Sequence, residues 1–307
     1  MGRVSVDLYP EQIGVSLAEV KTFAKSLGGS ATNVAVAAAR LGHPSAVITK
    51  VGADGFGPYV RKALEGFGVD PRWVGTDPDL RTPIVFCEIH PPDNFPLLFY
   101  REPKAPDMNL TPEDLDLDAI AAAPLFWMTG TGLSDEPSRT ATLNALERRS
   151  EGITVFDLDY RPMLWGSGDE ANLVFREALQ YATVAVGNQE EVEVAVGTRD
   201  PLEASAALLD LGLEIAVVKR GPDGVLARTA EGVVEAPPIE VEILNGLGAG
   251  DAFGGALCHG LLLGWDPERM IGYANAAGAI VASRLACADD MPTREEVEQL
   301  LERSAGV

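Results

Sequence analysis

Apolar, β-branched runs alternate along this chain with alanine- and leucine-rich stretches whose apolar residues recur at helical spacing. Strands that are apolar on both sides belong to parallel sheets covered by helices on both faces. We expect strands in SAVITKVG, PLFWMTG, GITVFDLD, ATVAVGN and LEIAVVKRG. We expect helices in SATNVAVAAARLG, YVRKALEGFG, SRTATLNALERRS, EASAALLDLG and AGDAFGGALCHGLLLG. The pattern therefore predicts an α/β fold with a mainly parallel central sheet flanked by helices.

Two segments, residues 5–16 and 81–103, interrupt this alternation with extended runs and Pro, Asp and Asn turns, and no helix separates their strands. The chain has no internal repeat, low-complexity tract or linker, so we expect one domain over residues 1–307. Both segments would leave that domain as a small β lid, which closes over a bound acceptor and excludes water. The apolar strands of the lid favour a homodimer joined through the lids.

Charge and composition argue against several classes of partner. The net charge of -22 disfavours nucleic acid and anionic membranes, because both are bound chiefly through clustered Lys and Arg. No apolar run reaches the roughly 18 to 20 residues that cross a bilayer, and no signal-peptide core is found. Cys87, Cys258 and Cys287 are too widely spaced for a zinc site or a disulfide framework, so free buried thiols fit best. We expect a cytoplasmic protein.

The stretch NGLGAGDAFGG, residues 245–255, is glycine-rich and carries one acidic residue at the start of an apolar helix. Gly248, Ala249 and Gly250 let the backbone approach a ligand, and consecutive amides form an anion-binding concavity at the positive end of the helix. Asp251 could cap the helix. It could instead act as a general base on a hydroxyl while the amides stabilise a phosphoryl group. No P-loop and no Rossmann glycine motif is present.

This stretch resembles the G-A-G-D signature of the ribokinase-like sugar kinases, also called the phosphofructokinase B family. GGSATNVAVAAARLG, residues 28–42, is similar to the N-terminal motif of that family. The resemblance implies ATP-dependent phosphorylation of a sugar hydroxyl, with amides of residues 248–250 as the anion hole and Asp251 as the base. Gly28, Gly29 and Asn33 would face the sugar, although the same stretch also reads as an ordinary turn and a capped helix.

Further positions follow from the resemblance. It implies that ATP contacts Asn188, Lys219, Gly221, Asn275 and Gly278, together with Gly248 and Gly250. It also implies that Glu191 organises Mg²⁺ through water, because Mg²⁺ prefers oxygen ligands and keeps part of its hydration shell.

One departure from the family concerns a monovalent cation. Many members carry D-T-x-G-A-G-D, whereas this chain has Asn245 and Gly246 at the first two positions. Several ribokinase-like enzymes hold a monovalent cation near that first aspartate, so a requirement for potassium stays open.

Candidate acceptor residues are partly basic. Asp7 in SVDLYP corresponds to the acidic residue that holds sugar hydroxyls in the family. Arg101 and Lys104 follow a lid strand and could meet the carboxylate of a sugar acid, although a solvated surface pair is the alternative. Asp157, Asp159 and Arg161 come just past a strand end, where α/β sheets bind ligands.

The segments MGRVSVDLYPEQIG, GNQEEVEVAVG and ACADDMPTREEVEQL resemble most closely the branch of the family that phosphorylates the 6-hydroxyl of 5-dehydro-2-deoxygluconate in bacterial myo-inositol catabolism. A 2-keto-3-deoxygluconate kinase is the first alternative, because it also binds a keto-deoxy acid. Another sugar or nucleoside kinase of the family and a non-catalytic ligand sensor are further alternatives. The intact G-A-G-D argues against the sensor, which needs no base.

Overall fold

The computed structural model describes residues 1–305 and contains a six-stranded sheet in the order β14-β13-β12-β11-β10-β9. Four of its strands are parallel: β9 (Leu125–Thr129), β10 (Ile153–Asp157), β11 (Val184–Asn188) and β12 (Ile215–Lys219). An antiparallel hairpin, β13 (Val225–Thr229) and β14 (Gly232–Ala236), extends one edge. The predicted α/β class with a mainly parallel sheet is confirmed. The hairpin was not predicted, because its strands are short and partly polar.

The parallel strands are buried on both faces, as their continuous apolar runs require. Side chains from successive strand residues alternate between two cores: Val155, Val184 and Val217 enter one, and Phe156, Ala185 and Val218 enter the other. The first core is covered by α1 (Ser30–Arg40), α2 (Phe56–Gly66), α8 (Ala249–Leu262), α9 (Pro267–Ala282) and α10 (Arg294–Ala305). The second is covered by α3 (Leu117–Ala122), α4 (Ser138–Arg148), α5 (Gly168–Leu179), α6 (Gln189–Val196) and α7 (Pro201–Asp210).

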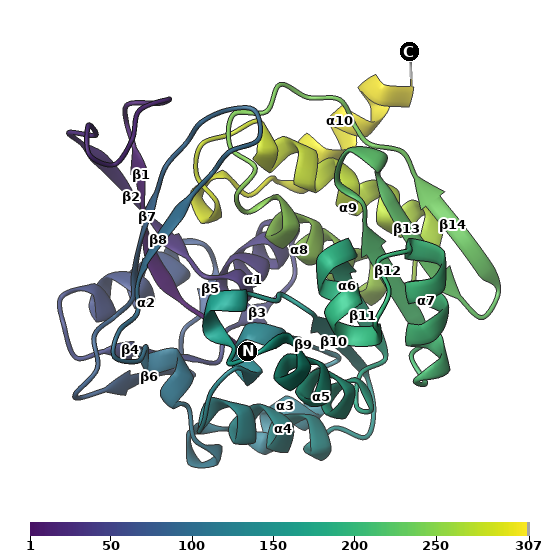
Figure 1. Ribbon diagram of the computed structural model, residues 1–307, viewed down its shortest axis with the longest axis horizontal. Helices are drawn as coiled ribbons and strands as arrows, with labels where there is room; N and C mark the ends of the chain where they lie inside the picture. The colour runs from purple at the N-terminus through teal and green to yellow at the C-terminus, as the bar shows by residue number, and fades with distance from the viewer. Residues whose placement is uncertain (306–307) are drawn as a thin grey trace.

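A second sheet of four strands projects from this body, at the upper left of Figure 1. Its order is β2-β1-β7-β8, with bounds β1 (Ser5–Pro10), β2 (Phe23–Gly28), β7 (Ile84–Cys87) and β8 (Leu97–Tyr100). The two segments expected to form a lid supply β1, β7 and β8. Strand β2 lies outside them and was not predicted. Leu98 and Tyr100 on β8 are 47% and 59% exposed, so this sheet carries apolar surface.

The segment SAVITKVG does not form the single strand expected of it. It splits into β3 (Ser45–Ala46) and β4 (Thr49–Gly52), because the two halves pair with different partners, β5 (Val69–Asp70) and β6 (Val74–Asp77). Strand β9 is an edge strand of the main sheet, and neither small sheet pairs with it. The amino group of Met1 donates to the carbonyl of Trp127 on β9 at 2.6 Å. Across residues 1–305, no helix has the length and apolar character needed to cross a bilayer.

Candidate active site

The carboxyl ends of three parallel strands bring polar side chains to one edge of the main sheet. Asp157, Asn188 and Lys219 are the last residues of β10, β11 and β12. In the parallel register, Asn188 lies beside Lys219, and Asp157 lies beside Val186. Open α/β sheets bind ligands at this edge, so three of the predicted site residues are brought together by the topology alone.

The glycine-rich turn begins α8 as expected. Gly248 adopts the left-handed conformation at φ 79°, and the helix starts at Ala249, so the first amides of α8 have no partner within the helix. Gly250 is exposed, while Gly248, Ala249 and Asp251 are partly exposed. A Cβ on Gly248 would overlap Cys287 Sγ, so only glycine fits this position. The turn is therefore open to a ligand on one side and closely packed on the other.

Asp251 lies in the first turn of α8 and is tied to α1. Asn33 Nδ2 donates to Asp251 Oδ2 at 2.8 Å. Loss of hydration raises the pKa of Asp251 to about 6, against the opposing effect of the Asn33 hydrogen bond. A carboxylate with a pKa near neutrality is suited to general-base catalysis. The structure thus gives Asn33 a contact with the candidate base, whereas the sequence suggested a contact with the sugar.

Lys219 approaches the same turn from β12. A Cβ built on Gly250 would lie 3.5 Å from Lys219 Nζ, so the ammonium group borders the anion-binding amides. Burial acts to lower the pKa of Lys219, but the carboxylates of Glu191, Asp157 and Asp251 raise it above its ordinary value. Burial raises the pKa of Asp157 well above its usual range. The site thus combines a charged lysine with a cluster of carboxyl groups.

Asn188 and Glu191 form a capping box at the start of α6. Asn188 Oδ1 accepts from the amides of Glu190 and Glu191, both at 2.9 Å, and Glu191 Oε2 accepts from the Asn188 amide at 2.7 Å. This arrangement satisfies orphan helix donors. Glu191 Oε1 has no hydrogen bond to any described residue. Within residues 1–305, no group of three or more His, Cys, Asp or Glu side chains is arranged to hold a metal directly.

On the acceptor side, Asp7 is buried on β1. Burial raises its pKa to about 6, although Ser5 Oγ donates to Asp7 Oδ1 at 2.6 Å. Gly28 packs so closely on Asp7 that a Cβ would overlap the carboxylate, and Gly29 packs in the same way on the backbone of Arg3. Close packing therefore explains why both positions are glycine: side chains there would keep β2 and the start of α1 away from β1 and the residues just before it.

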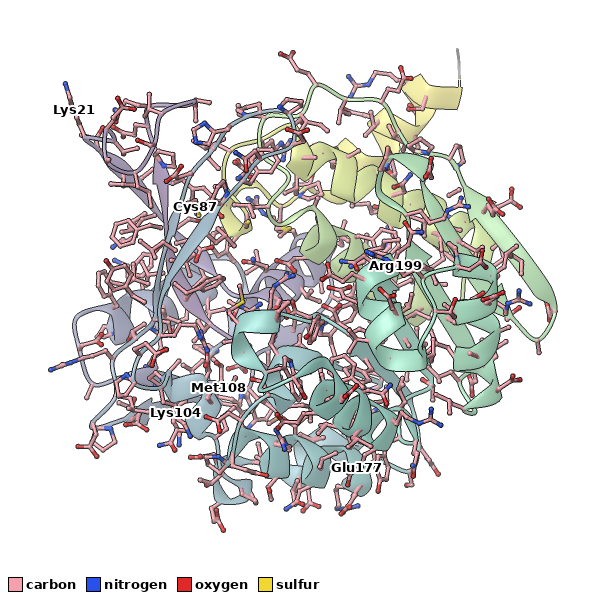
Figure 2. All side chains as sticks on the ribbon, in the orientation of Figure 1. Lys21, Cys87, Lys104, Met108, Glu177 and Arg199 are labelled. Atoms are coloured by element: carbon pink, nitrogen blue, oxygen red, sulfur yellow. The ribbon has the colours of Figure 1, made fainter. Side chains whose placement is uncertain are left out.

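Arg101 and Lys104 are engaged in ion pairs within the protein. Both terminal nitrogens of Arg101 donate to the fully buried carboxylate of Asp107, which also accepts from the Val4 amide at 3.0 Å. Lys104, labelled near Met108 in Figure 2, pairs with Asp135 at 2.9 Å. The sequence could not reveal these partners, because each pairing depends on how separate loops fold. A carboxylate-binding role for either residue stays a prediction.

Arg3 was not among the predicted site residues, and Asp159 was expected only as a residue just past a strand end, together with Asp157 and Arg161. Asp159 lies just after β10 and accepts hydrogen bonds from Arg3 Nη2 at 3.1 Å, Ser30 Oγ at 2.7 Å and Thr131 Oγ1 at 2.9 Å. Arg161 Nη2 lies 3.1 Å from its other oxygen. The available signal for Arg3 was its position four residues before Asp7 in MGRVSVDLYP, because residues i and i+4 of an extended chain lie on the same face.

The other residues expected to contact ATP are Asn275 and Gly278 on α9 and Gly221 in the turn that follows β12. Asn275 Nδ2 donates to the Pro237 carbonyl at 2.6 Å, and Gly278 packs against the start of α8. Gly221 is exposed with φ 59°.

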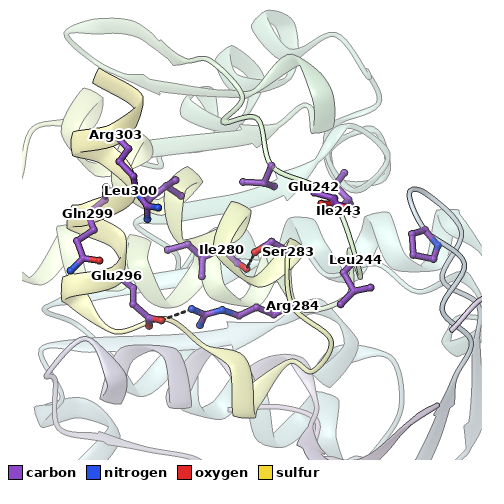
Figure 3. A pocket seen from close by; sticks show the side chains of 12 residues that line it. Glu242, Ile243, Leu244, Ile280, Ser283, Arg284, Glu296, Gln299, Leu300 and Arg303 are labelled. Carbon is purple, nitrogen blue, oxygen red and sulfur yellow. Dashed lines mark hydrogen bonds and ion pairs between the residues drawn. The ribbon is translucent and has the colours of Figure 1, made fainter. Parts of the chain in front are cut away.

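A cavity of about 720 Å³ lies beside the C-terminal end of α9. Its lining includes Ile280, Ser283 and the Arg284–Glu296 ion pair (Figure 3). None of the predicted site residues lines it.

Asn245 is buried just before the glycine-rich turn. Its side-chain Nδ2 donates to the Leu285 carbonyl at 2.6 Å, and its Oδ1 accepts from the Leu247 amide at 3.0 Å. The amide therefore connects the turn before α8 to the loop that follows α9.

The chain is similar to carbohydrate kinases over nearly its whole length. Residues 1–294 match the family described as pfkB family carbohydrate kinase. A protein of Geobacillus kaustophilus named 5-dehydro-2-deoxygluconokinase is 34% identical over 311 residues, covering 99% of this chain and 92% of the relative. A protein of the same name from Photobacterium profundum is 35% identical over 311 residues, covering 98% of this chain and 93% of the relative.

Solved structures share the fold. Aminoimidazole riboside kinase from Salmonella enterica, complexed with aminoimidazole riboside and an ATP analog, has a TM-score of 0.82 and 29% identity, with 98% of each chain covered. An E. coli protein provisionally assigned as Ribokinase II, in complex with ATP and Mg²⁺, has a TM-score of 0.89 and 25% identity, covering 98% of this chain and 97% of that chain. The ribokinase-like fold expected from the two motifs is confirmed.

Proposed function

Because the chain belongs to the pfkB family of carbohydrate kinases and is a phosphotransferase acting on a sugar hydroxyl, we propose that its acceptor is 5-dehydro-2-deoxygluconate. The γ-phosphoryl group of ATP would pass to the 6-hydroxyl of this acid, as a step of myo-inositol catabolism. The name of relatives at 34% and 35% identity supports the choice of acceptor. The observation that carries the chemistry is Asp251, a carboxylate with a pKa of about 6 beside the open amides of the turn that begins α8.

In this proposal, Asp251 orients the 6-hydroxyl and accepts its proton as the oxygen attacks phosphorus. The amides of residues 248–250 stabilise charge on the transferring group, at the positive end of α8. Lys219, which borders Gly250, adds a fixed positive charge at the same place. Phosphoryl transfer depends mainly on positioning and electrostatic stabilisation, and these groups supply both.

The residues present fit ATP and Mg²⁺. Gly221, Asn275 and Gly278 lie on the segments that would contact the nucleotide. Glu191 has one oxygen that no residue within 1–305 bonds, and it belongs with Asp157 to the carboxyl cluster around Lys219, an oxygen-rich donor set that suits Mg²⁺ held through water. When bound, Mg²⁺ neutralises charge on the phosphates. The E. coli neighbour with ATP and Mg²⁺ supports this pair of ligands.

A monovalent cation is not part of the proposal. Asn245 stands where many family members carry an aspartate, so its neutral amide, which donates to the Leu285 carbonyl, brings no negative charge to hold a cation. We therefore expect the kinase to work without potassium.

The sheet β2-β1-β7-β8 is proposed as a lid that closes over the acceptor and joins two chains into a homodimer. The exposed Leu98 and Tyr100 on β8 support the second role, because an exposed apolar edge strand tends to pair. A cytoplasmic location fits the three free, buried cysteines, since reduced thiols are typical of that compartment.

A coupled assay of ADP release tests the function. The panel holds 5-dehydro-2-deoxygluconate, 2-keto-3-deoxygluconate, neutral hexoses and adenosine, each with ATP and Mg²⁺. We expect the highest kcat/KM with 5-dehydro-2-deoxygluconate. Highest turnover with 2-keto-3-deoxygluconate or adenosine would assign the chain to another activity of the family. Saturable binding of a sugar acid without ADP release would instead indicate a non-catalytic sensor.

A further inference from the structure

Asp159 has an unusual backbone. Among residues 1–305 it is the only non-glycine residue with positive φ, at 27°, and it is 3% exposed. Such conformations are sparsely populated and persist only where the surroundings fix them, which is common at functional sites. Here the surroundings are the side chains of Arg3, Ser30 and Thr131, from three separate parts of the chain, and the strained residue is a hydrogen-bond acceptor that all three share.

One carboxylate serves two guanidinium groups. Asp159 Oδ2 accepts from Arg3 Nη2 at 3.1 Å, and Asp159 Oδ1 lies 3.1 Å from Arg161 Nη2. Burial alone would raise the pKa of Asp159, but Arg3 and Arg161 outweigh it and hold that pKa at about 2. The carboxylate is therefore ionised at neutral pH. Two arginines that share one carboxylate leave a net positive charge at this position.

Both arginines keep unused donors. Arg3 is held by Nε, which donates to Thr131 Oγ1 at 2.9 Å, and by Nη2, whereas its Nη1 has no hydrogen bond to the described residues. Arg161 Nη1 makes only a long contact of 3.4 Å with the Tyr160 carbonyl, and its side chain is 40% exposed. A guanidinium group has five N–H donors. The pair can therefore accept a further anionic partner without breaking the contacts that fix it.

The arginine pair lies one helical turn from the candidate base. Ser30 donates to Asp159, and Asn33 donates to Asp251, and both donors are on α1. Residues three apart on a helix are neighbours on one face, with Cβ atoms about 5–6 Å apart. A six-carbon sugar acid carries its carboxylate and its terminal hydroxyl at opposite ends. A molecule lying along this face of α1 can therefore meet the arginines at one end and Asp251 at the other.

We propose that Arg3, fixed by Asp159 and paired with Arg161, binds the carboxylate of the acceptor and so selects sugar acids over neutral sugars. Arg3 is thus a specificity residue, and Asp159 is a positioning residue that acts through it. The inference rests on the proposed function in that it assumes an acidic acceptor. It assigns the carboxylate to Arg3 and Arg161 because these two share the single carboxylate of Asp159, whereas Arg101 and Lys104 each have a carboxylate partner of their own, Asp107 and Asp135.

The test compares Arg3→Gln with wild type on 5-dehydro-2-deoxygluconate and on 2-deoxyglucose, a neutral sugar with a primary 6-hydroxyl. We expect KM for the acid to rise about 10- to 100-fold, because a charge-assisted pair is lost. The constants for the neutral sugar and the binding of ATP, measured by calorimetry, should stay unchanged. Arg3→Lys should recover part of the loss, since it restores the charge but not the planar fork. Arg148→Gln, which removes an exposed guanidinium paired with Asp118, is the control and should match wild type.

Equal losses on the acid and the neutral sugar would overturn the inference, since Arg3 would then act only on folding or on a shared step. If Arg3→Gln does not fold, Arg161→Gln, at the more exposed arginine, carries the same expectation and the same refutation. Asp159→Asn should raise KM for the acid while both arginines remain. A wild-type protein that prefers a different sugar acid would defeat the proposed function and leave this inference standing. A wild-type preference for neutral sugars would defeat the inference itself.

Discussion

Gly248→Ala should damage the turn that receives the phosphoryl group. Gly248 has φ 79°, and a methyl group there would overlap Cys287 Sγ, which accepts a hydrogen bond from the Tyr9 hydroxyl at 2.8 Å. A left-handed backbone costs a non-glycine residue about 1–2 kcal/mol, and overpacking in a well-packed region costs about 1–3 kcal/mol. We therefore expect Gly248→Ala to lower the free energy of unfolding by about 2–5 kcal/mol in total.

Gly264→Ala is the matched control. Gly264 follows α8 with φ 64°, but no heavy atom lies within 4 Å of the position that a Cβ would take. It should therefore show only the backbone cost of about 1–2 kcal/mol. For a chain of this length, 1 kcal/mol corresponds to a Tm shift of roughly 1.5 °C. Differential scanning calorimetry should show a drop of roughly 3–8 °C for Gly248→Ala and roughly 1.5–3 °C for Gly264→Ala.

The activity of the two variants separates a local effect on the turn from a general loss of stability. Displacing one donor of an anion hole costs about 10²- to 10³-fold in kcat, so a partial displacement in Gly248→Ala should cost at least about 10-fold. Gly264→Ala should keep the wild-type kcat. Steady-state ADP release is measured well below both Tm values, so that a loss of kcat reports a local effect on the turn and not a general loss of stability. A wild-type kcat for Gly248→Ala would refute the reasoning that this turn must stay closely packed on Cys287.

Three further predictions concern pH, cations and assembly. The pKa of Asp251 is raised to about 6 and the base must be ionised, so kcat/KM should fall as pH decreases through about 6; a flat profile down to pH 4.5 would exclude it as the base. Initial rates should be equal in potassium and in tetramethylammonium chloride, because neutral Asn245 stands where many family members carry an aspartate; a clear potassium activation would contradict this. Leu98→Asp should convert a dimer to a monomer in light scattering at micromolar concentration, because it places a charge on the exposed strand β8; a wild-type monomer, or a dimer that survives the change, would count against the lid interface.

Much of the fold and of the phosphate side could be predicted from the sequence, because the signals are local. Apolar runs and helical spacing placed the four parallel strands and five of the helices (α1, α2, α4, α7 and α8), but they gave no expectation of α5 between β10 and β11. The turn before Asp251 could be recognised because glycines, an acidic residue and a helix start are adjacent in the chain. The strand expected over residues 45–52 was wrong, since its split depends on which partner each half finds.

The acceptor side could not be predicted in the same way. Asp159 accepts hydrogen bonds from Arg3 and Ser30 and pairs with Arg161. No local sequence pattern predicts that these segments come together, or that this aspartate adopts a positive φ. Arg101 had the residue type expected of a carboxylate binder, but its partner Asp107 is already inside the protein. A basic residue therefore indicates an anion site only after its internal partners are known.

The central claim is that Asp251 prepares the acceptor hydroxyl while the adjacent amides receive the phosphoryl group. Asp251→Asn keeps the size of the side chain and removes only its capacity to take a proton. With 5-dehydro-2-deoxygluconate and ATP, we expect kcat to fall at least about 10²-fold, while ATP binding by calorimetry stays at the wild-type affinity. A near-normal kcat in this variant would contradict the account.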